Sequence, residues 1–416
     1  MSGERFRSIP ERDSIVEKVP YITPGRIARK LSVEVIKRGL LDRLASDGIL
    51  PTSESKSILA ELHQKADGTT PWDMVFEHTV PVRNSIYLLA NKHAHPDMWM
   101  RDYEHTSEFT ESPRMDDNVL KTFENRQRKN GQAPTAVGIF GHTPWHYADD
   151  ESSLSYVIKT AQLTRVDAST FTPRRREKVR GSLGFFGEHV SNGMYVTPKG
   201  ERRGWLDSFI YPRSDVVTQN QGLYAVALLS ASELGFGIDA EEIKTAIQLY
   251  NSLAEDFNGY LPLSAHFNEA PDISALYPEY LAITMFDQQM LSDSVVSATL
   301  EQTPMSRHGY KVLTMSPKGE YFDPAYFVTG YEQGKYQNGG MWPIWHNNAL
   351  VVGELHALVK PESYRGAVMQ QLDETDWPES IRTGGEFEDR ITPENLRQAW
   401  DVKIPAQHRV LDKLAA

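Results

Sequence analysis

Apolar residues recur at helical spacing along most of this chain. In residues 218–234, for example, Leu223, Val226 and Ala227 fall on one stripe, which continues through Ser230 to Leu234. Comparable spacing begins at residue 26 and returns after each short loop. Helices are predicted at about 26–44, 52–65, 114–130, 152–164, 173–190, 218–234, 240–257, 278–292, 343–359, 363–372 and 393–414. The pattern indicates a mainly helical protein with about ten to twelve helices.

Extended segments are few and short. Residues 137–141 read as one strand, and 194–197 with 204–206 read as a hairpin around a Pro-Lys-Gly-Glu turn. A second pair is expected at 310–315 and 321–328. No linker or low-complexity segment divides the chain. We therefore expect an N-terminal arm over residues 1–25, which is polar and proline-containing, and one helical domain over residues 26–416.

Composition narrows the function classes. The 416 residues contain no cysteine, which excludes disulfides, thiolate catalysis and cysteine metal sites. The formal net charge of −12 argues against a nucleic-acid partner, and we interpret the basic run 173–180 as an exposed helix start. The start of the chain is polar, and no segment offers about 18 consecutive apolar residues. These features predict a cytoplasmic protein without a membrane partner, and leave a homo-oligomer open.

Polar and aromatic residues gather in four loop clusters at predicted helix ends. The clusters are residues 97–104, 141–151, 204–221, and the double segment 336–343 with 377–384. Each places an acid or an amide beside Trp or Tyr. Aromatic rings stack on the apolar faces of sugars, while carboxylates, amides and Arg bind sugar hydroxyls. Two simpler interpretations stay open: a surface ion pair of Arg101 with Asp102, and capping of the next helix by Asp149 or Asp150.

Other site chemistries have weaker support. His93 and His95 form an HxH pattern, but no third ligand is signalled, so we expect no metal and no cofactor. The chain has no GxSxG motif for a serine nucleophile. Paired carboxylates remain, and these are the groups that glycoside hydrolysis requires, one to donate a proton and one to stay ionised. In the stretch GWLDSFIYP, Trp205 and its aromatic neighbours would keep Asp207 poorly solvated, which raises a carboxyl pKa.

Taken in order, the clusters resemble the signatures of the (α/α)6-barrel inverting glycosidases. The similarity is closest to the neutral/alkaline invertases and the glycogen-debranching glucosidases. The segments that carry it are WMRDYEHTSEF (99–109), HYADDESSL (146–154), GWLDSF with TQNQGLYAVAL (204–209 and 218–228), YQNGGMWPI (336–344), and WPESIRTG with RQAWDV (377–384 and 397–402). The resemblance spans about residues 97–402, most of the chain.

The resemblance implies an all-α fold, a toroid of six helical hairpins with a few short β-hairpins in the rim loops. It implies hydrolysis with inversion of a small α-glucoside or related oligosaccharide. Asp207 falls on the general acid and Glu379 on the general base, with Glu386 and then Glu388 as rival bases. The expected sugar-binding positions are Trp99, Arg101, Asp102, Tyr103, His146, Asp150, Trp205, Gln219, Gln221, Gln337, Asn338, Trp342, Trp377 and Glu386.

The sequence departs from the family pattern in three places. Gln219 stands where relatives often carry Glu, the segment after Glu379 lacks the usual aromatic, and little chain follows residue 402 for a last helix. Two other functions therefore stay open. One is a non-hydrolytic sugar enzyme on the same barrel, an epimerase or a glycoside phosphorylase, for which His142, His146 and His346 are candidate groups. The other is a catalytically silent carbohydrate-binding toroid.

Overall fold

The computed structural model describes residues 51–90, 97–138, 151–198, 211, 213–312, 341–378, 380–382, 391, 393–394 and 396–415. The predicted arm at 1–25, the helix at 26–44 and the strand at 321–328 lie outside these residues. Within them, thirteen α-helices make up most of the structure. None of the helices in this described part is long and apolar enough to cross a membrane.

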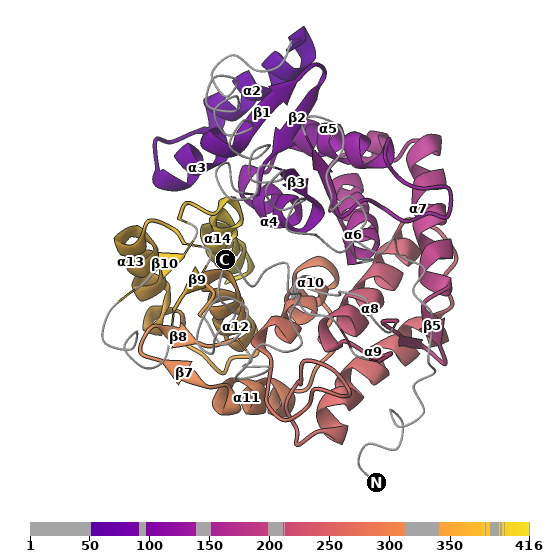
Figure 1. Cartoon of the computed structure of the whole chain (residues 1–416), viewed down its shortest axis with the longest axis vertical. Helices are drawn as coiled ribbons and strands as arrows, with labels where there is room; N and C mark the ends of the chain where they lie inside the picture. Colours follow the sequence, from indigo (N-terminus) through magenta and orange to yellow (C-terminus); the bar gives the residue numbers. More distant parts are fainter. Residues whose placement is uncertain are drawn as a thin grey trace, which may run out of the picture.

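Six helices form a closed inner ring. They are α4 (Met100–Thr110), α6 (Glu151–Val166), α8 (Thr218–Glu233), α10 (Tyr277–Phe286), α12 (Pro343–Leu355) and α14 (Lys403–Ala415). Each packs on the next, and α14 packs on α4, so the ring closes (Figure 1). The short remainder after residue 402 is thus enough for the last inner helix. The sequence-based expectation that little chain remains for it was wrong, because thirteen residues already span about 20 Å.

Six further helices surround the ring and alternate with it along the chain. They are α3 (Thr70–His78), α5 (Pro113–Glu124), α7 (Pro173–Gly187), α9 (Ala240–Asp256), α11 (Asp293–Gln302) and α13 (Arg365–Thr375). The alternation gives six outer–inner pairs, the predicted all-α (α/α)6 toroid. An additional helix, α2 (Ser53–Lys65), packs on the strand pair of residues 79–82 and 85–88. Short 3-10 turns η2 (Ile273–Leu276) and η6 (Ala399–Val402) precede α10 and α14.

Inner and outer helices differ in how their sequences are buried. The outer helices α5 and α9 have one buried and one exposed face. The inner helix α8 is buried nearly all round, so the single stripe expected there understates its burial. Helix α4 was not predicted, because Asp102, Glu104 and His105 make it look exposed in sequence, yet nine of its eleven residues are buried. Helices α3 and α11 were missed as well.

The described strands form five antiparallel pairs. They are β1 (Thr79–Val82) with β2 (Ser85–Leu88), β3 (Asp97–Trp99) with β4 (Ala136–Gly138), β5 (Val190–Ser191) with β6 (Met194–Tyr195), β7 (Met305–Ser306) with β8 (Gly309–Tyr310), and β9 (Ser380–Ile381) with β10 (Pro393–Glu394). The predicted partners of residues 194–197 and 310–315, at 204–206 and 321–328, lie outside the described residues. Within them, residues 194–195 pair with β5 around Asn192-Gly193, whose positive φ angles of 52° and 78° suit a two-residue hairpin turn. Tyr310 pairs with Met305.

Several predicted helices are shorter than expected, and the one at 114–130 ends at Glu124. The helix at 278–292 ends at Phe286, where Asp287 adopts the left-handed conformation with φ of 51°. The helix at 393–414 begins only at Lys403, because β10 and η6 occupy the preceding residues.

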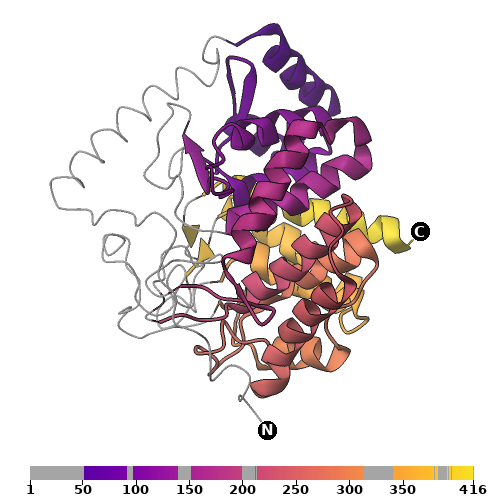
Figure 2. The same cartoon turned by 90° about the vertical axis from the view of Figure 1, so that its right-hand side faces the viewer.

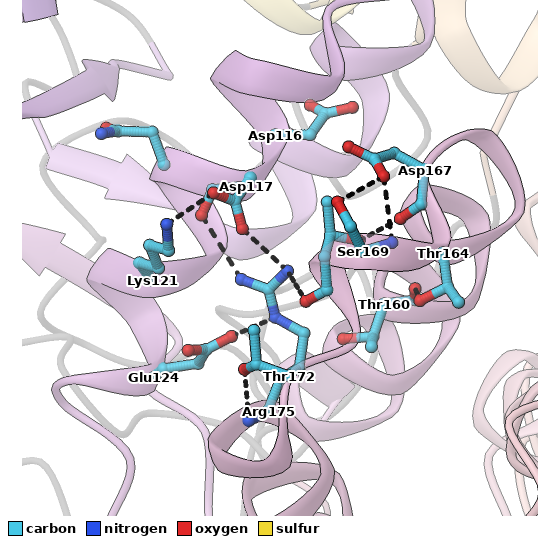
Figure 3. A network of polar contacts seen from close by, with 12 residues as sticks. Asp116, Asp117, Lys121, Glu124, Thr160, Thr164, Asp167, Ser169, Thr172 and Arg175 are labelled. Carbon is cyan, nitrogen blue, oxygen red and sulfur yellow. Dashed lines mark hydrogen bonds and ion pairs between the residues drawn. The ribbon is translucent and has the colours of Figure 1, made fainter. Parts of the chain in front are cut away.

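A buried ionic network joins the outer helices α5 and α7 (Figure 3). Arg175, only 1% exposed, pairs with Glu124 and Asp117 and donates to the Thr170 carbonyl. Glu124 also accepts a hydrogen bond from Tyr156 of α6. The basic run 173–180 does begin a helix, α7, but the expectation that it is exposed fails at Arg175, because the carboxylates of α5 draw this side chain inward.

Candidate active site

The inner helices begin at the same end of the ring, where contacts between their first turns bring distant segments together. Arg101 of α4 binds Glu151 of α6, and Asp102 of α4 accepts a hydrogen bond from Gln398 just before η6. Lys403 of α14 binds Tyr277 of α10. Figure 2 shows the C-terminal end of α14 on the opposite side of the molecule from β9 and β10. The described parts of three clusters, residues 97–104, 218–221 and 341–343, open or directly precede the inner helices α4, α8 and α12, so they lie at this end.

Arg101 and Asp102 are charged side chains in the first turn of α4, at this end of the ring. The Arg101 guanidinium donates to both Glu151 oxygens, at 3.3 and 2.8 Å, with side-chain exposures of 11% and 4%. Asp102, 7% exposed, accepts from Gln398 Nε2 at 3.2 Å. The interpretation of Arg101 and Asp102 as a surface ion pair was therefore wrong, because Asp102 is buried, Arg101 is largely buried, and both bind groups of neighbouring elements. A bidentate pair fixes its partners in orientation as well as distance.

Four aromatic rings pack together beside these charges. Trp342 and Trp400 meet at a ring distance of 5.5 Å, and Trp345 lies 6.3 Å from Trp400. His105 contacts both Trp345 and Trp400, at 5.7 and 5.8 Å. Only Trp342 was predicted from sequence as a site residue. His105, Trp345 and Trp400 were missed, although each lies in the first two turns of an inner helix or just ahead of one, and that position could have indicated them.

A buried polar network lies beneath the aromatic rings. Lys403 Nζ is 2.9 Å from Tyr277 OH, 3.0 Å from His105 Nδ1 and 3.1 Å from Glu108 Oε1. Burial, followed by the charge of Lys403, holds the pKa of His105 well below its usual value. Burial also lowers the pKa of Lys403, against the opposing effect of Glu108. His105 is therefore neutral, and since Nδ1 accepts from the ammonium, its proton is on Nε2.

A carboxylate–histidine pair lies ahead of α8. Asp215 is fully buried and accepts from Ser264 Oγ at 2.5 Å and from His266 Nδ1 at 2.9 Å. Ser264 and His266 both bind Asp215, so they do not form the Ser–His hydrogen bond that a nucleophilic serine requires. Asp215 belongs to the 204–221 cluster, whereas Ser264 and His266 were not predicted from the sequence. Among the residues that the structure describes, no three His, Asp or Glu side chains are grouped to hold a metal ion.

The other predicted residues fall into three groups. Three are committed to packing: Tyr103 OH binds Asp116 of α5, Gln221 binds Tyr195 N and Ala246 O, and the buried Trp377 donates to Asp373. Trp99 and Gln219 are buried next to the first turns of α4 and α8. The remaining predicted residues lie outside the described ones: Asp207, Glu379, His146, Asp150, Trp205, Gln337, Asn338 and Glu386.

The chain on either side of the two predicted carboxylates is anchored at this same end. Ile381, two residues after Glu379, exchanges backbone hydrogen bonds of 2.7 and 2.9 Å with Met341, the neighbour of Trp342. Thr197 and Asp215 exchange bonds of 2.7 and 2.9 Å, and they bracket the segment that contains Asp207.

Comparison with known proteins identifies the fold. No family model matches the chain, and no curated protein matches it. Among solved structures, a wild-type glycosidase superposes with a TM-score of 0.55 at 13% identity, covering 88% of this chain and 99% of its own. The GH63 mannosylglycerate hydrolase from Thermus thermophilus in complex with Tris gives a TM-score of 0.53 at 10% identity, covering 86% and 100%. The chain has the fold of these glycosidases. Since nearly the whole length of each glycosidase is matched, the likeness covers the complete ring.

Proposed function

We propose that this protein is a glycoside hydrolase that acts on a small α-glucoside or related oligosaccharide with inversion at the anomeric carbon. Asp207 is the general acid that protonates the leaving oxygen, and Glu379 is the general base that activates water. The observation that carries the proposal is the gathering of Asp102, Trp342 and Trp400 at one end of a glycosidase-like ring. Tryptophan faces and a buried carboxylate suit the apolar and hydroxyl faces of a sugar.

The anchored segments support the same assignment. Backbone pairing of Met341 with Ile381 and of Thr197 with Asp215 ties the chain around both predicted carboxylates to this end. An inverting site needs its carboxyl groups about 6.5–9.5 Å apart, so that a water fits between the base and the sugar. Two separate segments held on a rigid ring can maintain such a spacing, whereas adjacent carboxylates would compete for one proton.

The non-hydrolytic alternative gains no support from His346. Its Nδ1 accepts a hydrogen bond from Tyr310 N at 3.2 Å, and burial lowers its pKa to about 4. A histidine held neutral by burial is a poor acid for epimerisation at neutral pH.

The test is a panel of disaccharides and reducing-end glycosides, incubated with and without phosphate and read by release of the free sugar. Hydrolysis gives the free sugar without phosphate, and proton NMR of the first-formed product then shows the inverted anomer. Sugar phosphate formed only with phosphate would mean phosphorolysis, and an epimeric product would mean epimerisation. Binding without any product would mean a silent toroid.

A further inference from the structure

His266 is oriented by a fully buried carboxylate. Asp215 Oδ1 accepts from His266 Nδ1 at 2.9 Å and from His266 N at 3.2 Å. The same oxygen accepts from Val216 N at 2.8 Å, and Oδ2 accepts from Ser264 Oγ at 2.5 Å. Because a carboxylate accepts, His266 Nδ1 carries a proton, and in the neutral ring this leaves the lone pair on Nε2.

The other side of the imidazole has no partner among the residues that the structure describes. All hydrogen bonds of His266 go to Asp215, and its side chain is 19% exposed. Its Nε2 is therefore an oriented acceptor that a ligand can reach.

The position of His266 relates it to the candidate active site. Val217 pairs with Ser264, and Thr218, the first residue of α8, donates to the Leu263 carbonyl at 3.0 Å. The Phe267 ring contacts the Tyr211 ring at 6.1 Å. His266 is thus on the loop that leads from α9 to α10, at the end where the inner helices begin. Its neighbour Phe267 packs on Tyr211, which belongs to the GWLDSFIYP acid segment by sequence.

A purely structural role would not require the imidazole. Ser264 Oγ and the amides of Val216 and His266 already join the two loops through Asp215. Ser264 also accepts from Phe267 N at 3.1 Å, which completes the turn. The additional bond to Nδ1 fixes the ring and so directs Nε2.

We propose that His266 binds a hydroxyl of the leaving group of the substrate through Nε2, and that Asp215 is its positioning residue. This inference rests on the proposed glycosidase function. Exposure favours the leaving group: Trp345 and Trp342 are 0% and 1% exposed, whereas the His266 side chain is 19% exposed. If the proposed hydrolase removes the terminal sugar of a small oligosaccharide, that sugar reaches furthest inward, and a partly exposed group meets the sugar that departs.

Two substitutions separate the functions of the two ring nitrogens. In His266→Asn, the amide nitrogen takes the place of Nδ1, so the Asp215 bond is kept and the Nε2 acceptor is lost. In His266→Gln, the side chain end takes the place of Nε2 and the Asp215 bond is lost. Each variant and the wild type are assayed on a disaccharide and on the nitrophenyl glycoside of the same terminal sugar, with thermal melting and calorimetric binding of the disaccharide as parallel readouts.

For His266→Asn we expect an unchanged melting temperature. The loss of one hydrogen bond should raise KM for the disaccharide roughly tenfold and weaken its binding. Activity on the nitrophenyl glycoside should change little. His266→Gln should recover part of the disaccharide binding while melting lower. Wild-type behaviour of His266→Asn on both substrates would overturn the assignment, as would an equal loss on both. A wild-type protein that binds but does not cleave refutes the proposed hydrolysis, and calorimetry still decides His266. A wild-type protein that neither cleaves nor binds the disaccharide overturns both the proposed hydrolysis and the role of His266.

Discussion

Lys403 Nζ lies 3.0 Å from His105 Nδ1, and neither side chain is exposed to solvent. His105 is on α4, the first helix of the inner ring, and Lys403 opens α14, the last. The Lys403 ammonium also binds the hydroxyl of Tyr277 on α10, and it lies 4.1 Å from the centre of the Tyr277 aromatic ring. A single buried cation therefore joins three helices where the ring closes, below the aromatic residues of the candidate active site.

Replacing Lys403 by Met should reduce the free energy of unfolding by about 3–5 kcal/mol, because it leaves buried partners without their cation. The matched control is Lys413→Met on the same helix, whose ion pair with Glu111 has side-chain exposures of 67% and 54%. That change should cost less than about 1 kcal/mol. Urea unfolding followed by circular dichroism measures both, and equal small losses would mean that the buried network does not stabilise the ring closure.

Asp207→Asn should lower kcat by about 10²–10⁴-fold while sugar binding is retained, because an amide cannot donate the catalytic proton. Glu379→Gln should have a comparable effect, and Glu386→Gln a much smaller one. Steady-state kinetics with calorimetry of the same sugar distinguishes them. Normal turnover by the Asp207 variant would remove the acid from the assignment, and a larger loss at Glu386 would transfer the base to that residue.

The free energy of unfolding should fall as rising pH removes the proton from His356. Burial disfavours the charged ring, but hydrogen bonds to Glu279 and Asp293, at 3.0 and 2.8 Å, raise its pKa above the usual 6.5. A raised folded-state pKa contributes stability that is complete below about pH 6.5 and is lost as pH rises through the folded-state pKa. The difference in free energy of unfolding between wild type and His356→Gln should thus be larger at about pH 6 than at about pH 9. If this free-energy difference does not become smaller between about pH 6 and pH 9, His356 is uncharged in the folded protein.

Gly222→Ala should destabilise the contact between α8 and α10 by about 1–3 kcal/mol. A Cβ at this position would lie 2.6 Å from Pro278 and 2.9 Å from Tyr250, so neighbouring helices would have to separate. Gly184→Ala on the outer helix α7 is the control, since nothing lies within 4 Å of its Cβ. It should stabilise by up to about 1 kcal/mol through helix propensity. Thermal melting gives the sign of each, and the same sign for both would contradict the packing argument.

Local patterns predicted much of the fold. The outer helices α5 and α9 were found from their spacing, because each has a mainly apolar face toward the ring and a polar face toward water. Helix α4 escaped because its Asp102, Glu104 and His105 face partners on other inner helices or just ahead of one rather than water. Burial of paired charges has no signature in a local window.

The candidate site was predicted in part. Trp342, Arg101 and Asp102 were named from their motifs, and the structure brings them to one end of the ring. Lys403 and Trp400 were not named, because their partner His105 is about 300 residues away in sequence. Conversely, Gln221 was named from its motif, but its position on the α8 helix turns the amide toward α9.

The sequence by itself determined the helical class, the approximate number of helices and the loops that carry acids and aromatic residues, because spacing and residue type are local properties. Only the tertiary structure decided which of those side chains meet. Closing the ring puts the starts of six inner helices at one end, and this brings Asp102 to Gln398 and Trp342 to Trp400. Those contacts depend on how each helix is rotated about its axis, and packing against two neighbours and an outer helix sets that rotation.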